Sequence, residues 1–197
     1  MPRVNEIFYS LQGEGFHSGT PAVFVRLSGC NLRCHFCDTS HDAGKGMTVE
    51  QIAETVNRVA SQAPLLVLTG GEPSLWIDDE FIATLKSLTG KTIAIETNGT
   101  RPLPRGIDWV TFSPKDAFAG GDLEPCVLKE CDELKVVYLG QDLSRYDHIT
   151  ARHRFLQPCF CPDEEERERQ LKLTARAVLA HPTWRLSLQT HRLVGLP

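Results

Sequence analysis

Short apolar runs alternate with amphipathic segments along most of the chain. Residues 21–27 and 64–69 are nearly continuous apolar runs, and each is followed by polar or turn residues. Runs of this length that end in turn residues are typical of strands buried on both faces. We therefore predict strands at residues 3–9, 21–27, 64–69, 91–96, 109–112, 133–138, 154–157 and 184–189.

Three segments between these strands have apolar residues at helical spacing. Thr48 and Gln51 have the spacing of a capping box at the start of the first helix. Asp78 begins the second helix, and the acidic run at 163–169 begins the third, because acids in a first turn complement the helix dipole. Between about residues 102 and 131 the helical signal weakens. Strands alternating with few helices indicate an α/β fold with a mostly parallel sheet.

Length and composition favour one globular domain over residues 1–197. Hydrophobic residues make up 41% and charged residues 23%, and no apolar run approaches the roughly 20 residues of a membrane span. The formal net charge of −4 gives no electrostatic footprint for nucleic acid. The chain begins without signal-peptide features, and its seven cysteines do not form a disulfide framework. We expect a cytoplasmic protein with a small-molecule substrate and no membrane partner.

Three cysteines, Cys30, Cys34 and Cys37, lie within eight residues directly after a predicted strand. A chain spans at most about 3.3–3.6 Å per residue, so this loop can fold around one small inorganic group. Thiolates are soft ligands that suit zinc or an iron–sulfur cluster. Three cysteines favour a 4Fe-4S cluster with one open iron. The alternatives are a zinc site completed by His35 or His41, and three buried structural cysteines.

Polar residues also follow the other predicted strands at their carboxyl ends, where parallel sheets place their ligand sites. Gly70 and Gly71 allow backbone groups to approach a ligand, although turns use the same residues. Arg26 can clamp a carboxylate or form a structural ion pair. Further polar strand ends lie at residues 96–99, 113–115, 157–158 and 189–191. The sequence therefore predicts one site at this edge.

Several motifs resemble those of a known enzyme superfamily. The cysteine spacing, with an aromatic residue at Phe36, and Gly-Gly-Glu-Pro at 70–73 resemble radical SAM motifs. In that superfamily the open iron binds S-adenosylmethionine, and electron transfer from the cluster releases a 5′-deoxyadenosyl radical. The segments 6–15, 37–39, 96–99, 113–115 and 189–191 extend the resemblance, over nearly the whole chain, to the 7-carboxy-7-deazaguanine synthase family.

The resemblance implies an activity and a fold. Family members convert 6-carboxy-5,6,7,8-tetrahydropterin to 7-carboxy-7-deazaguanine with loss of ammonia, a carbon–nitrogen lyase reaction of queuosine and 7-deazapurine biosynthesis. It implies an abbreviated, partly open radical SAM barrel with six mostly parallel strands and few helices. A homodimer and an electron donor such as a flavodoxin or ferredoxin are implied partners. The implied cofactors are one 4Fe-4S cluster, S-adenosylmethionine and Mg²⁺.

The resemblance also assigns roles to individual residues. The cluster falls to Cys30, Cys34 and Cys37, Mg²⁺ to Thr39, and catalytic roles to Glu14, Arg26 and His191. Substrate contacts fall to Leu11, Gln12, Gly13, Glu14, Arg26, Thr69, His191 and Pro197. S-adenosylmethionine contacts fall to His35, Phe36, Gly71, Glu96, Ser113, Pro114, Lys115, Gln157, Pro158, Cys159 and Phe160.

Some alternatives stay open at this point. Gln12 and Glu14 can belong to a surface loop, Thr39 to a local hydroxyl turn, and His191 to the structural core. Outside the cysteine loop, four cysteines are either packed hydrophobes or ligands of a second cluster: Cys126, Cys131, Cys159 and Cys161. Alternative functions are a radical SAM activase that forms a glycyl radical on a partner protein, and a non-enzymatic metal-binding module.

Overall fold

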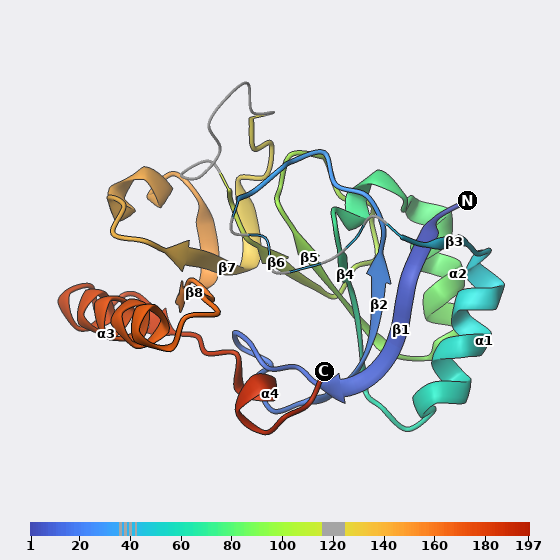
Figure 1. Ribbon diagram of the computed structural model, residues 1–197. Helices are drawn as coiled ribbons and strands as arrows, with labels where there is room; N and C mark the ends of the chain where they lie inside the picture. The colour runs from blue at the N-terminus through green and yellow to red at the C-terminus, as the bar shows by residue number, and fades with distance from the viewer. Residues whose placement is uncertain (36, 38, 40, 42, 116–124) are drawn as a thin grey trace.

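The computed structural model describes residues 1–35, 37, 39, 41, 43–115 and 125–197, and in them one nine-stranded sheet (Figure 1). The strands are β1 (Arg3–Leu11), β2 (Pro21–Leu27), β3 (Lys45–Gly46), β4 (Leu65–Gly70), β5 (Thr92–Thr97), β6 (Trp109–Phe112), β7 (Glu130–Tyr138), β8 (Thr150–Pro158) and β9 (Arg185–Leu186). The helices are α1 (Val49–Ala60), α2 (Asp79–Thr89), α3 (Glu164–Ala180) and α4 (Thr190–Leu193), with 3-10 turns η1 (Pro73–Leu75) and η2 (Leu143–Tyr146).

The strand order is β3-β1-β2-β4-β5-β6-β7-β8-β9, and the two end strands leave the sheet open. Strands β2, β4, β5, β6, β7 and β8 run parallel, as the resemblance implied. The strand count of six was nevertheless wrong for the described residues. Antiparallel β1 and two-residue β3 extend one edge, and two-residue β9 extends the other. A two-residue strand is too short to produce a readable alternation.

One predicted strand is much shorter than expected. The segment 184–189 pairs with β8 only through Arg185 and Leu186. The chain then turns into α4, whose N-cap is Gln189. The other seven predicted strands are confirmed, with ends displaced by a few residues.

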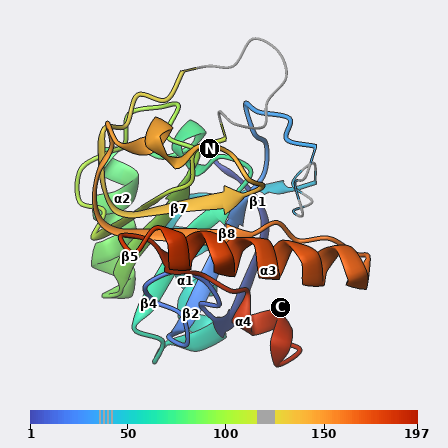
Figure 2. The same cartoon turned by 90° about the vertical axis from the view of Figure 1, so that its left-hand side faces the viewer.

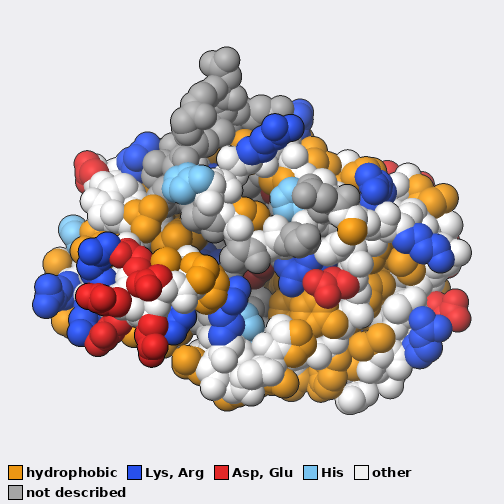
Figure 3. All heavy atoms as spheres, in the orientation of Figure 1, with side chains coloured by type: hydrophobic (Ala, Val, Ile, Leu, Met, Phe, Trp, Pro, Cys, Tyr) orange, Lys and Arg blue, Asp and Glu red, His pale blue; other side chains and the backbone are white. Residues whose placement is uncertain are grey.

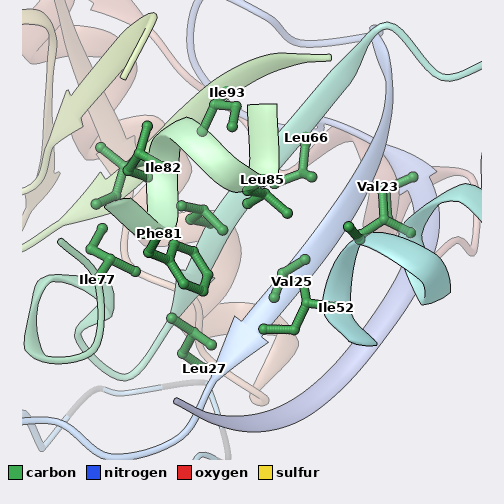
Figure 4. Close-up of a cluster of buried hydrophobic side chains, with 14 of the residues drawn as sticks. Val23, Val25, Leu27, Ile52, Leu66, Ile77, Phe81, Ile82, Leu85 and Ile93 are labelled. Carbon is green, nitrogen blue, oxygen red and sulfur yellow. The ribbon is translucent and has the colours of Figure 1, made fainter. Parts of the chain in front are cut away.

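Alternation along the parallel strands builds the core. In β2, Val23, Val25 and Leu27 pack toward α1 and α2, as the labelled side chains in Figure 4 show. Ala22 and Phe24, at the alternate positions of the same strand, belong to a separate cluster on the inner face of the curved sheet. Successive strand residues point to opposite faces, so both faces of β2 are buried. Each fully buried aliphatic side chain contributes roughly 1.5–3 kcal/mol.

The inner face changes from apolar to polar along the strands. Phe24, Val67 and Ala94 form part of the inner apolar cluster. Two residues further along the same strands stand Arg26, Thr69 and Glu96, which line a cavity. A step of two residues keeps the side chains on one face. The parallel strands therefore deliver their polar side chains to a common end of the barrel.

The helix starts follow the sequence prediction. Thr48 and Gln51 form the capping box of α1, Asp78 caps α2, and Asp163 caps α3. Figure 2 shows α3 crossing the face of the sheet at β8. Its exposed side carries mixed acidic and basic groups (Figure 3), so the acidic run is a solvated helix start as predicted.

The helix-poor middle is also as predicted, because residues 102–115 and 125–131 contain no helix. Among the helices described, none is both long and apolar enough to cross a membrane.

Candidate active site

A cavity of about 590 Å³ opens at the polar end of the inner face. It gathers most of the predicted site residues from distant parts of the chain. These are Leu11, Gln12, Glu14, Arg26, Cys30, Cys34, Cys37, Thr39, Thr69, Gly71, Glu96, Ser113, Lys115, Gln157, Pro158, Cys159, Phe160, His191 and Pro197. Gly13, His35 and Pro114 do not line it, and Phe36 lies outside the described residues.

The segment after β1 reaches the cavity from the opposite end of the barrel. Because β1 is antiparallel to β2, Leu11 pairs with Pro21 at the start of β2. We call residues 12–20 the floor loop, since they cross the amino ends of the parallel strands. Phe16 stacks on Trp109 and on His153 there, with ring centroids 4.8 and 4.3 Å apart. The floor loop thus closes the base of the barrel.

Gly13 joins the floor loop to the last segment of the chain. A Cβ at Gly13 would lie 1.9 Å from His191 Nδ1, so only glycine fits beside this imidazole. Thr190 N also donates to the Gly13 carbonyl oxygen, at 2.9 Å. The hydrogen bond between Thr190 and Gly13 joins residues that are 177 positions apart in the sequence. Gly13 therefore acts by letting His191 approach the cavity.

A buried ionic network lies inside the cavity. Lys135 on β7 forms ion pairs with Glu14 of the floor loop and, at 3.1 Å, with Glu96 at the end of β5. Thr69 Oγ1 donates to Glu96 Oε2 at 2.9 Å, and Gln189 Nε2 donates to Glu14 Oε1 at 2.9 Å. Although burial alone lowers the pKa of Lys135, Glu14 and Glu96 raise it well above its usual value. The ammonium therefore stays charged.

Arg26 forms the structural ion pair that the sequence left open as one interpretation. Its Nε donates to Glu6 Oε1 at 2.6 Å, and its guanidinium lies over the Phe8 ring, 5.5 Å from the centroid. The same side chain lines the cavity. The ion pair and the ring hold the guanidinium in place, where it can present further N–H donors to an anionic ligand.

Lys115 forms another part of the cavity wall. Its Nζ donates to the Ser113 carbonyl oxygen at 3.0 Å and to Ser113 Oγ at 2.5 Å. Burial, followed by repulsion from Lys135, lowers the pKa of Lys115. Two predicted cofactor residues therefore contact each other directly.

The turn after β4 supports the cysteine loop through close backbone packing. A Cβ at Gly71 would lie 1.9 Å from the Gly29 carbonyl oxygen. Glu72 N donates to that same oxygen at 2.9 Å, and Trp76 Nε1 donates to the Ser28 carbonyl oxygen at 2.7 Å. The need for glycine at Gly71 thus comes from the neighbouring backbone, although Gly71 also lines the cavity.

Glu72 extends this support to the end of β5. Its carboxylate is fully buried and accepts from Thr97 Oγ1 and Asn98 N, each at 2.7 Å. Asn98 Nδ2 then donates to Asn31 Oδ1 at 3.0 Å. Asn31 directly follows Cys30, so a chain of hydrogen bonds fixes the start of the cysteine loop.

The cysteine loop has a donor set that suits an iron–sulfur cluster. Cys30, Cys34 and Cys37 line the same cavity. Burial raises the pKa of Cys30 and of Cys34, and a bound metal would offset this by stabilising the thiolates. In the described residues no three Cys, His, Asp or Glu side chains converge as a preformed metal site. Three cysteines that line one cavity would suit a 4Fe-4S cluster, because the fourth iron would stay open to a ligand in that cavity.

Two of the remaining cysteines pack as hydrophobes. Cys126 and Cys131 pack against a hydrophobic cluster beside β7 and α3, which includes Phe112, Leu134 and Leu156. Burial raises the pKa of Cys131 to about 12. Cys159 instead lines the cavity, whereas the Cys161 carbonyl oxygen accepts from Arg167. These positions favour the packed-hydrophobe interpretation for Cys126 and Cys131.

Sequence reasoning missed Lys135 and Glu133. Both lie on the inner face of β7, two residues apart, and both are buried. Burial raises the pKa of Glu133, whose carboxylate accepts from Phe16 N at 2.9 Å. Charged residues at alternate positions of an apolar strand were the available signal, because such strands are buried on both faces.

Comparisons with known proteins agree with this arrangement. The radical SAM superfamily profile matches residues 24–118. The chain is 54% identical to a 7-carboxy-7-deazaguanine synthase of Bacteroides thetaiotaomicron over 100% of its length and 99% of that protein. A 7-carboxy-7-deazaguanine synthase of Caulobacter vibrioides is 41% identical, with 98% of each chain covered. QueE from Escherichia coli superposes with a TM-score of 0.75 at 29% identity, covering 95% of this chain and 93% of that structure.

Proposed function

The chain belongs to the 7-carboxy-7-deazaguanine synthase family of the radical SAM superfamily, and we propose that it converts 6-carboxy-5,6,7,8-tetrahydropterin to 7-carboxy-7-deazaguanine. The reaction contracts the ring with loss of ammonia, as a carbon–nitrogen lyase of queuosine and 7-deazapurine biosynthesis. The observation that carries the proposal is 54% identity along the whole chain to a protein of that name. The cavity supplies groups suited to each part of the reaction.

The cofactors of the superfamily would lie along one wall of the cavity and the substrate along the other. A 4Fe-4S cluster with S-adenosylmethionine supplies a hydrogen-abstracting radical when both are bound. Cys30, Cys34 and Cys37 would hold the cluster. The S-adenosylmethionine side would be formed by Gly71, Ser113, Lys115, Gln157, Pro158, Cys159 and Phe160, with His35, Phe36 and Pro114 near them in sequence. The resemblance assigned Glu96 to S-adenosylmethionine, but its carboxylate contacts Gln12, Thr69 and Lys135, so we propose it for the pterin side. Mg²⁺ would take the Thr39 hydroxyl together with substrate oxygens, since this hard ion prefers oxygen ligands.

The other wall binds the pterin. Glu14 and Glu96 present carboxylate acceptors, which suit the amino and ring N–H groups of a pterin. Arg26 presents donors suited to the substrate carboxylate. Leu11, Gln12 and Thr69 line the same wall, and His191 and Pro197 close it. Holding the ring in one orientation directs hydrogen abstraction to one carbon.

The proposal extends to the setting in which the protein works. We propose that residues 1–197 act as one radical SAM domain, in the cytoplasm and as a homodimer. An external electron donor such as a flavodoxin or ferredoxin would reduce the cluster.

Anaerobic reconstitution tests the proposed function. The protein is loaded with iron and sulfide and mixed with reductant, S-adenosylmethionine, Mg²⁺ and 6-carboxy-5,6,7,8-tetrahydropterin. The expected product is 7-carboxy-7-deazaguanine, detected by mass spectrometry, without net consumption of S-adenosylmethionine. Accumulation of 5′-deoxyadenosine without the deazaguanine would refute the substrate assignment while leaving the radical chemistry intact.

Metal analysis separates the cluster from its alternatives. We expect about four irons per chain, the content of a single 4Fe-4S cluster. Cys34→Ala should lose the cluster absorbance, whereas Cys131→Ala should keep it, because Cys131 packs against the hydrophobic cluster beside β7 and α3. One zinc per chain, or about eight irons, would contradict the single-cluster assignment.

A further inference from the structure

Lys135 is a buried ammonium held between two carboxylates of the cavity, with a side chain 7% exposed. We propose that Lys135 is the positioning residue that orients Glu14 and Glu96 as acceptors for the substrate's N–H groups. The inference rests on the proposed function, because it assumes a pterin in the cavity. It adds a residue for which none of the sequence motifs provided a role.

The geometry singles out Lys135 because it joins three elements. Glu14 comes from the floor loop, Glu96 from the end of β5 and Lys135 from the middle of β7. Each carboxylate also has its other oxygen held, Glu14 Oε1 by Gln189 and Glu96 Oε2 by Thr69. Both carboxylates are thereby fixed from two sides, and Lys135 is the contact they share.

The balance of charges in the cavity also points to Lys135 as the residue that orients the two carboxylates. Glu14 and Glu96 carry two negative charges that share the one ammonium of Lys135. Like-charged carboxylates held close together tend to share a proton, and a protonated carboxyl becomes a donor. The other charged groups near the network are Glu133 below Lys135 on β7 and Lys115 after β6. Lys115 is held by Ser113, so Lys135 is the lysine that contacts both carboxylates.

Substrate recognition follows from this arrangement. Two ionised carboxylates accept hydrogen bonds but donate none. A ligand that offers N–H donors to them is therefore favoured over one that offers only acceptors. Loss of the ammonium would let one carboxylate take a proton and would remove the charged link between Glu14 and Glu96, while the hydrogen bond from Gln12 Nε2 to Glu96 Oε1 stays in place. Both effects weaken substrate binding and leave the S-adenosylmethionine wall in place.

The test compares Lys135→Met and Lys135→Arg with the wild-type holoenzyme in the pterin assay. Lys135→Met should raise KM for the pterin by about 10- to 100-fold, since breaking a buried charge pair is costly. KM for S-adenosylmethionine should stay within about twofold. Lys135→Arg keeps the charge and should restore most of the pterin affinity.

A pH profile separates positioning from a structural role. In Lys135→Met the pterin KM should rise further as the pH falls from about 9 to 6, because the unpaired carboxylates then take up a proton. Lys135→Met/Glu96→Gln removes one of the two like charges and should lose much of that pH dependence.

Lys91→Met is the matched control. Lys91 is equally buried, but its ammonium donates to carbonyl oxygens of Ala60, Ser61 and Ala63 at the end of α1. Its loss should lower Tm without changing the pterin KM.

Several outcomes would overturn the inference. An unchanged pterin KM in Lys135→Met, an equal rise in both KM values, or a double variant as pH-dependent as Lys135→Met would each do so. If Lys135→Met does not fold, Lys135→Arg is compared with Glu14→Gln instead. An equal loss of pterin affinity in these two variants at every pH would refute charge-based positioning. A wild-type enzyme that makes no deazaguanine would overturn both the inference and the proposed function, whereas a normal wild type isolates the failure to Lys135.

Discussion

Glu72 holds the cysteine loop through hydrogen bonds that a single amide substitution disrupts. One carboxylate oxygen accepts from Ser74 N, Ser74 Oγ and Thr97 Oγ1, at 3.1, 2.7 and 2.7 Å. The other accepts from Asn98 N at 2.7 Å. Glu72→Gln keeps the shape of the side chain but turns one oxygen into an NH₂ donor. Whichever way the amide faces, a donor meets a donor.

The cost follows from the buried bonds lost. A hydrogen bond to a charged group contributes about 1.5–3 kcal/mol, and a buried polar group left unpaired costs about 1–3 kcal/mol. If the amide places its NH₂ toward Asn98, one charged bond is lost and one backbone N–H is left unpaired. We therefore expect Glu72→Gln to lower the free energy of unfolding by roughly 2–5 kcal/mol.

Urea denaturation followed by tryptophan fluorescence measures this change. Glu80→Gln is the control, because Glu80 is an exposed first-turn acid of α2 whose interaction with the helix dipole is worth only about 0.3–1 kcal/mol. A Glu72→Gln protein as stable as Glu80→Gln would refute the hydrogen-bond account of the turn after β4.

The same variant should affect the cluster. Asn98 links Glu72 to Asn31, the neighbour of Cys30. We expect Glu72→Gln to retain less iron per chain after reconstitution than Glu80→Gln does. Equal iron contents would mean that the cysteine loop is positioned without Glu72.

Three further changes test other contacts. Ser10 Oγ donates to the main-chain oxygen of Pro197 at 2.7 Å. Ser10→Ala should therefore raise the pterin KM about 2- to 10-fold in steady-state assays, which is the effect of losing one neutral hydrogen bond. An unchanged KM would mean that this contact does not position Pro197. Burial lowers the pKa of His17 below its usual 6.5, so the unfolded state binds the proton first and stability should fall as the pH falls below about 6.5. His17→Phe should flatten that decline in urea titrations at several pH values, and an equally steep decline would assign it elsewhere. Lys91→Met should lower the free energy of unfolding by about 1–3 kcal/mol, because the substitution removes the ammonium that pairs with carbonyl oxygens at the end of α1. Thermal denaturation measures this change in stability, and an unaltered Tm would contradict the prediction.

Local patterns in the sequence predicted most of the elements and the direction of the chemistry. The apolar runs and the caps at Thr48, Asp78 and Asp163 act over a few residues, so they can be read without the fold. The cysteine spacing is equally local. The rule that parallel strands end at a common edge then predicted the meeting of Thr69, Glu96 and Ser113 at one cavity.

Contacts between distant segments were decided by the tertiary structure alone. Antiparallel β1 brings the floor loop to the amino ends of the other strands, and nothing in residues 12–20 encodes which strand β1 joins. The close fit of Gly13 to His191 likewise depends on a neighbour far along the chain.

Lys135 shows the same limit at the centre of the site. Its ion pairs with Glu14 and Glu96 exist because sheet order places β7 opposite the floor loop and near β5. Periodicity states which face of a strand a residue occupies. It does not state which residues face it, because that depends on strand order and on the curvature of the whole sheet.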